Sequence, residues 1–143
     1  MFKKIILTDD QKTTLLIRLM VGAVFLSEGI QKFLFADTLG TGRFRKIGIP
    51  DPEFFGPFVG TFEITCGILI LAGSFTRLAA IPLITIMLVA IATTKAAVLA
   101  NDGFWEMLHG SRTDWAMLLG GIFLLIKGGG KWSIDRQMVV KYN

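Results

Sequence analysis

Five charged side chains stand inside long apolar stretches of this 143-residue sequence. A charge at the centre of a bilayer costs about 2.5–3.5 kcal/mol even on a lenient insertion scale, so each such residue requires a partner or a function. Buried carboxylates can relay protons, and buried cations can hold the oxygen atoms of a ligand. The five residues are Arg18, Glu28, Lys32, Glu63 and Lys95.

Together these five residues are the predicted ligand-binding set. We expect Arg18, Lys32 and Lys95 to hold the ligand's oxygen atoms. Glu28 and Glu63 are the candidates for proton relay, the only catalytic role that the sequence suggests. The alternative is that all five charges form ion pairs that fix the helices to one another without any ligand.

The apolar stretches themselves predict an all-α, polytopic membrane protein. Hydrophobic residues make up 52% of the chain and charged residues 18%, with a mean hydropathy of +0.61, which is too apolar for a soluble domain of this length. About 20 residues of apolar helix cross the ~30 Å of hydrocarbon. We therefore expect one domain, residues 1–143, built as a bundle of four transmembrane helices. The predicted spans are residues 13–35, 54–72, 76–100 and 113–127, with residues 36–53 as a connector.

Spacing within the first two spans indicates how the charges are arranged. Glu28 and Lys32 are four residues apart, in the order that favours an ion pair within one helix. In the second span, Gly60 and Gly67 share a helix face with Glu63. Small residues on one face allow close helix approach, which would carry Glu63 into the bundle.

Basic and apolar residues are mixed within the connector, in the segment 43–49 with the sequence RFRKIGI. This segment predicts either a short piece lying in the membrane interface, with its bases toward lipid headgroups, or an ordinary surface loop.

Several functional classes are excluded or disfavoured by composition. The single cysteine, Cys66, rules out a Cys-x-x-Cys redox pair within the chain. The single histidine, His109, rules out haem held by two histidines of one chain. No haem, flavin or zinc motif is present, and we predict no metal site. The formal charge of +4 comes with no nucleic-acid motif, so we expect no nucleic-acid partner.

Four stretches carry a family resemblance: RLMVGAVFLSEGIQKF in the first span, IGIPDP in the connector, GTFEITCGILILAGSFTRLAAIPLITIMLVA over the second and third spans, and SID near the end. Together they resemble the DoxX family of small bacterial membrane proteins, over roughly residues 18–135. The resemblance implies a four-helix integral membrane bundle in the bacterial cytoplasmic (inner) membrane. Some relatives are tied to quinone-linked sulfur oxidation or to thiol and oxidative-stress complexes.

Two functions follow as predictions. The first is a membrane subunit or accessory of a redox system, which binds quinone or another small polar ligand in the charged pocket. The second is a non-enzymatic scaffold or small transporter-like protein whose buried charges are structural. The lipid bilayer is a partner in both; a redox partner protein, assembly with other copies of the chain, and enzymatic activity stay open.

Orientation in the membrane follows from the even number of spans, which puts both termini on one side. The loops on that side are richer in lysine and arginine than the loops on the other side. By the positive-inside rule, both termini are predicted to be cytoplasmic.

Overall fold

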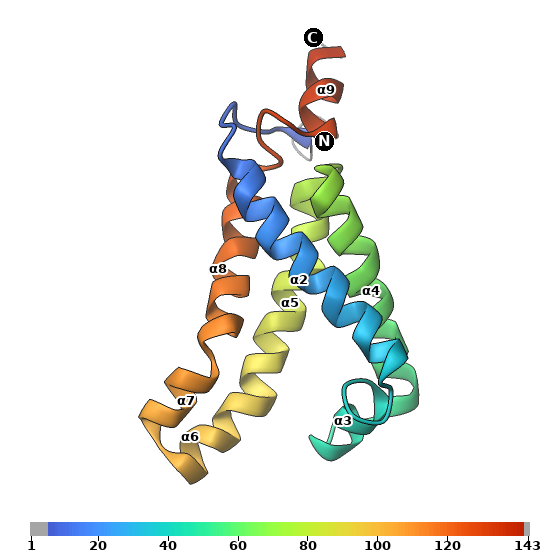
Figure 1. Ribbon diagram of the computed structural model, residues 1–143, viewed down its shortest axis with the longest axis vertical. Helices are drawn as coiled ribbons and strands as arrows, with labels where there is room; N and C mark the ends of the chain where they lie inside the picture. Colours follow the sequence, from blue (N-terminus) through green and yellow to red (C-terminus); the bar gives the residue numbers. More distant parts are fainter. Residues whose placement is uncertain (1–5, 142–143) are drawn as a thin grey trace.

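The structure, a computed structural model, describes residues 6–141, and every regular element in that range is a helix (Figure 1). The prediction of an all-α protein is confirmed. The bundle is formed by α2 (Thr14–Leu34), α4 (Pro52–Ala72), α5 (Thr76–Ala90) and α8 (Arg112–Lys127). Shorter elements are α3 (Thr41–Lys46), the π-helical turn η1 (Ile91–Lys95), α6 (Ala96–Asp102), α7 (Phe104–Gly110) and α9 (Ile134–Lys141).

Three described helical segments are long and apolar enough to cross a membrane: α2, α4 and the continuous run Thr76–Asp102. The fourth bundle helix, α8, has 16 residues, fewer than the ~20 that a straight crossing requires. It packs along α5 and α2 and completes the four-helix bundle. Large apolar side chains such as Leu16, Leu119 and Ile126 point outward, as expected for a protein that contacts lipid.

Helices α2 and α4 touch through glycines. A Cβ atom on Gly29 would lie 2.7 Å from the carbonyl oxygen of Gly60, and one on Gly67 would lie 2.9 Å from the backbone nitrogen of Leu26. No side chain larger than hydrogen fits at these points. The close approach predicted from the glycine-lined face of the second span is confirmed.

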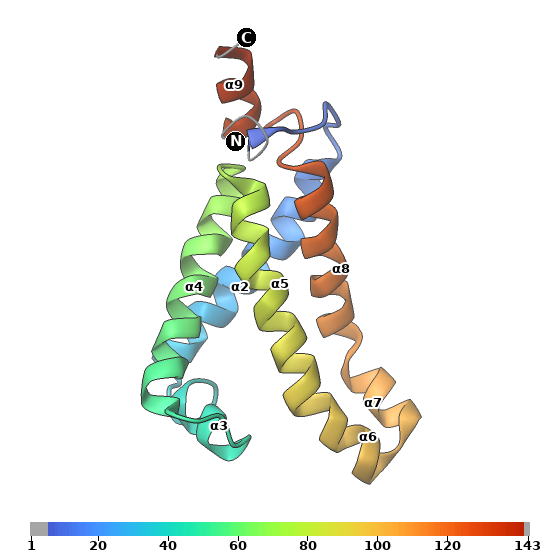
Figure 2. The same cartoon turned by 180° about the vertical axis from the view of Figure 1, so that it is seen from behind.

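The four helices meet at one end of the bundle and separate at the other (Figures 1 and 2). At the end that holds both ends of the described chain, a shared apolar core joins the helices. The separated end has α2, α4 and α3 on one side and α5, α6, α7 and α8 on the other. The buried core includes Val21, Phe25, Ile70, Leu83, Leu118 and Leu124.

The segments before α2 and after α8 close the narrow end. Asp9 donates its backbone N–H to Lys127 O at 3.0 Å, and Lys131 donates its own to Gln11 O at 3.1 Å. Because these bonds join the two ends of the chain, both ends lie on the same side of the bundle.

Asp135, at the start of α9, caps α5 from outside that helix. Its carboxylate accepts the backbone N–H of Phe75 at 2.7 Å and that of Thr76 at 2.9 Å. Phe75 has a left-handed backbone conformation, with φ of 48°, which is unfavourable for a bulky residue. The carboxylate therefore stabilises both a strained turn and the first N–H groups of a helix, which have no partner inside it.

Candidate functional site

A cavity of about 640 Å³ lies between the two separated halves of the bundle. Its walls come from α2, α3, α4, α5, η1 and α8, and most of the lining side chains are apolar. The volume and lining are typical of a pocket for a small organic ligand. The charged residues that line it are Glu28, Lys32, Arg43, Glu63 and Asp114.

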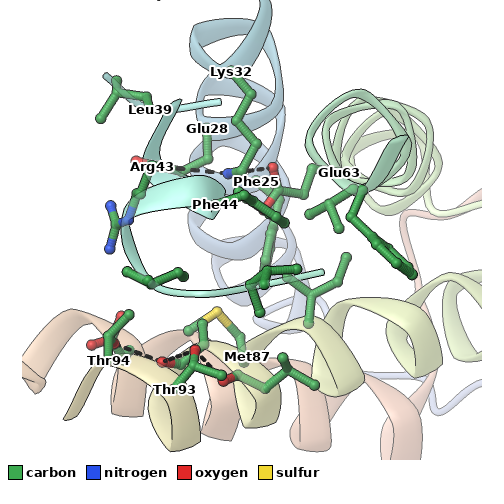
Figure 3. Close-up of a pocket in the computed structure, with 18 of the residues that line it drawn as sticks. Phe25, Glu28, Lys32, Leu39, Arg43, Phe44, Glu63, Met87, Thr93 and Thr94 are labelled. Carbon is green, nitrogen blue, oxygen red and sulfur yellow. Dashed lines mark hydrogen bonds and ion pairs between the residues drawn. The ribbon is translucent and has the colours of Figure 1, made fainter. Parts of the chain in front are cut away.

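Two carboxylates share one ammonium group on the α2–α4 wall, and we call Glu28, Lys32 and Glu63 the Lys32 triad. Lys32 Nζ lies 2.7 Å from Glu63 Oε2 and 4.0 Å from Glu28 Oε2 (Figure 3). The side chains of Glu63 and Lys32 are only 5% and 12% exposed, whereas that of Glu28 is 50% exposed. The closer and more buried ion pair is therefore the one between helices.

The glycine contact between α2 and α4 positions this ion pair. A Cβ atom on Gly60 would lie 3.4 Å from Lys32 Cβ, so Lys32 begins almost against the backbone of α4. Glu63 is one helical turn further along α4 from Gly60 and faces the same way. Close packing of the backbones thus brings the ammonium and the carboxylate together.

A second ion pair lies on the other half of the bundle. Lys95 Nζ is 3.0 Å from Asp114 Oδ2 and donates a hydrogen bond to Gly110 O at 2.7 Å. Asp114 lines the cavity, whereas Lys95 is not one of the lining residues.

Hydroxyl groups face the Lys32 triad across the cavity. Thr93 donates to Val89 O at 2.8 Å and Thr94 donates to Ala90 O at 2.6 Å (Figure 3). Each hydroxyl oxygen keeps lone pairs that can accept a hydrogen bond from a ligand. Both residues belong to the π-helical turn η1, a kind of irregularity that is frequent at functional sites. The predicted span 76–100 includes these residues, but the change of helix type within it was not predicted.

Helix α3 and the residues after it form one wall of the cavity. Phe44, Ile47 and Ile49 line it, whereas Arg45 and Lys46 do not. Arg43 lines the cavity and makes no ion pair or side-chain hydrogen bond with any residue in the range 6–141. The segment 43–49 is thus partly helical and carries its apolar residues toward the cavity.

Arg18 lies away from the cavity, at the narrow end of the bundle. Its guanidinium donates to Ile70 O at 2.8 Å, to Leu71 O at 2.5 Å, to Gly129 O at 3.2 Å and to Trp132 O. Four of its five N–H groups are used in this way. Ile70 and Leu71 belong to the last turn of α4, whose carbonyls have no partner within the helix.

Of the five predicted ligand-binding residues, the fold brings Glu28, Lys32 and Glu63 together at the cavity. Lys95 reaches the site only through Asp114, and Arg18 does not reach it. Sequence reasoning did not assign Arg43 or Asp114 to the site. For Arg43, the alternation of bases and apolar residues in the segment 43–49 was the available signal. For Asp114, the signal was a charge at the start of an apolar span.

Comparison with known proteins agrees with this architecture. The DoxX family profile matches residues 13–96, which include the Lys32 triad and the π-helical turn. The chain is 51% identical, over 136 aligned residues, to an uncharacterized membrane protein of Mycobacterium tuberculosis, Rv3486, with 91% of this chain and 83% of that protein covered. No solved structure gives a significant match. The chain therefore belongs to the DoxX family of membrane proteins.

Proposed function

We propose that the protein binds a small amphipathic, quinone-like ligand in the cavity, as a membrane subunit or accessory of a redox system. The observation that supports this proposal is the Lys32 triad, whose buried Lys32–Glu63 ion pair lies on one wall of a largely apolar cavity of about 640 Å³. Such a cavity suits a ligand with an apolar body and a polar head.

Lys32 is the residue that would bind the ligand's head group. An ammonium group has three N–H donors, and the two carboxylates of the triad occupy at most two of them in single contacts. The remaining donor is available to a carbonyl or hydroxyl oxygen of the ligand. Thr93 and Thr94 offer acceptors on the opposite wall, which suits a ligand that carries oxygen atoms at two ends.

The redox part of the proposal comes from the family resemblance, since some DoxX relatives are tied to quinone-linked oxidation. The chain carries no motif for a redox cofactor of its own. An accessory role, in which a partner protein supplies the electron chemistry, is therefore favoured over a stand-alone enzyme.

The family resemblance implies a bacterial inner-membrane location. The distribution of bases supports an orientation with the narrow end of the bundle on the cytoplasmic side. The cavity would then lie toward the opposite face of the membrane. Lys3 and Lys4, which contributed to the predicted orientation, lie outside the described residues. Within them, the bases at or beside the narrow end, apart from the buried Arg18, are Lys12, Arg77, Lys127, Lys131, Arg136 and Lys141. The bases in the connecting segments of the other end are Arg43, Arg45, Lys46 and Arg112.

A scaffold whose charges are structural is the second candidate. Arg18 supports it directly, because its guanidinium bonds to backbone carbonyls on two other segments. The ion pair between Lys95 and Asp114 also joins separate elements. In this alternative, the Lys32–Glu63 pair would likewise serve only to hold α2 against α4.

Native mass spectrometry of gently extracted protein tests the proposal. Val89 lines the cavity and is 48% exposed, whereas its neighbour Leu88 is 53% exposed and does not line it. Val89→Trp should fill the cavity without disturbing the core, and Leu88→Trp is the matched control. We expect the wild type and Leu88→Trp to retain one small amphipathic molecule that Val89→Trp has lost. If the wild type and both variants carry no such molecule, the scaffold is favoured.

A further inference from the structure

The positive and negative charges around the cavity are equal in number. This balance limits the charge that a bound ligand can carry. Three carboxylates and three cations take part, so their formal charges sum to zero. An anionic head group would therefore leave one uncompensated negative charge in an apolar space, which is strongly unfavourable. The carboxylates are Glu28 on α2, Glu63 on α4 and Asp114 on α8; the cations are Lys32 on α2, Arg43 on α3 and Lys95 on η1. The cavity-lining threonines of α5 and η1 add no charge.

We propose that an amphipathic anion binds Lys32 together with one proton, which Glu63 takes up from water. This inference rests on the proposed function, because it assumes that the cavity binds an amphipathic ligand. The ligand class is a molecule with an apolar body and a single anionic head, such as an aliphatic sulfonate, a carboxylate or a phenolate. No covalent bond of the ligand changes: the Glu63 carboxylate becomes a neutral carboxylic acid, and the complex keeps its charge.

Glu63 is the proton acceptor because it depends most on Lys32. If the ammonium turns toward an anion in the cavity, Glu63 loses a contact of 2.7 Å, whereas Glu28 was already 4.0 Å away. Glu63 is also the most buried carboxylate of the three, with a side chain 5% exposed against 50% for Glu28 and 26% for Asp114. Asp114 keeps its own partner, Lys95.

Lys32 can move in the way this requires. Its ammonium is carried on a flexible four-carbon chain that starts beside the backbone of α4. Glu28, one turn away on the same helix, keeps the ammonium near the cavity as it leaves Glu63. A buried carboxylate left without its cation is costly, whereas the neutral acid can donate a hydrogen bond.

The test uses 1-decanesulfonate, a strong acid that is ionised throughout the working pH range and cannot itself carry the proton. The full-length protein is placed in nanodiscs of uncharged lipid and titrated by calorimetry in two buffers that differ in ionisation enthalpy. We expect uptake of about one proton per bound sulfonate, and a Kd that rises about tenfold per pH unit above neutrality. Because the Val89→Trp side chain fills the cavity, the heat that this variant gives comes from partition of decanesulfonate into the lipid. That heat is subtracted from the wild-type heat.

Two matched variants identify the carboxylate that takes up the proton. Glu63→Gln should bind decanesulfonate with no proton uptake and with a Kd that does not depend on pH. Glu28→Gln should still take up the proton, because Glu28 is 50% exposed and water screens most of its charge, whereas the buried Glu63 still loses its close cation. Persistence of the pH dependence in Glu63→Gln, or its loss only in Glu28→Gln, would overturn the assignment to Glu63.

The wild type alone also decides the inference. Binding of decanesulfonate without proton uptake overturns it. So does binding of a neutral decyl-benzoquinone when decanesulfonate does not bind, although that result leaves the proposed function standing. If neither probe binds, and Val89→Trp and wild-type protein retain the same molecules, the proposed function fails as well.

Discussion

Lys32 on α2 and Glu63 on α4 are joined at 2.7 Å beside a contact where the two helices meet through glycine backbones. The ion pair and the glycine contact depend on each other, because the two charged groups meet only when the backbones are close. The arrangement places a charged pair at the wall of an apolar cavity.

Gly29→Ala tests this dependence. The new Cβ would lie 2.7 Å from Gly60 O and 2.9 Å from the backbone nitrogen of Ile64, so α2 and α4 must separate. We expect a loss of about 1–3 kcal/mol of stability, as for other overpacked contacts, measured by thermal unfolding in detergent. Gly110→Ala is the control, since a Cβ there meets no atom of the described part of the chain within 4 Å. Equal melting temperatures for the two variants would contradict the close contact.

Arg18→Met separates stability from ligand binding. The substitution leaves the carbonyl oxygens of Leu71 and Gly129 without the guanidinium donor, and it leaves that of Ile70 with only the backbone N–H of Gly73. Each buried acceptor that is left unsatisfied costs about 1–3 kcal/mol. The expected result is a large drop in melting temperature, with unchanged affinity for decyl-benzoquinone under conditions where the variant is folded. Loss of binding at an unchanged melting temperature would instead return Arg18 to the ligand site.

The control for Arg18→Met is Arg45→Met. Arg45 is exposed and, among residues 6–141, pairs only with Glu53 on the surface. Exposed ion pairs contribute about 0–1 kcal/mol, so this variant should melt close to the wild type.

Asp135→Asn tests the cap on α5. Asparagine keeps one acceptor oxygen and loses the charge, so one of the two bonds to the N–H groups of Phe75 and Thr76 should be lost. We expect a loss of about 1–2 kcal/mol, the range for a helix cap, in a chemical denaturation experiment. Asp102→Asn, at an exposed site, should have little effect. No difference between these two variants would show that the cap does not contribute to stability.

The ion pair between Lys95 and Asp114 is open to a double-mutant cycle. Lys95→Met, Asp114→Asn and the double variant should give an interaction energy of about 0.5–3 kcal/mol, since the partners are in direct contact. Strict additivity of the two changes in unfolding free energy would mean that the pair does not hold η1 against α8.

The sequence by itself was sufficient for the four bundle helices and for part of the triad. Apolar stretches of membrane-spanning length determine where the helices run. The spacing of four residues places Glu28 and Lys32 on one helix face, and the glycine spacing around Glu63 indicates a close contact. These are properties of one helix at a time, and local spacing determines them.

Only the tertiary structure decided which charges share a site. Lys32 lies closer to Glu63 than to its sequence neighbour Glu28, Arg18 lies at the opposite end among backbone carbonyls, and Arg43 enters the cavity wall from a connector. The rotation and depth of one helix against another depend on how side chains from several helices pack together. Because that packing is a property of the whole bundle, no spacing within one segment could reveal it.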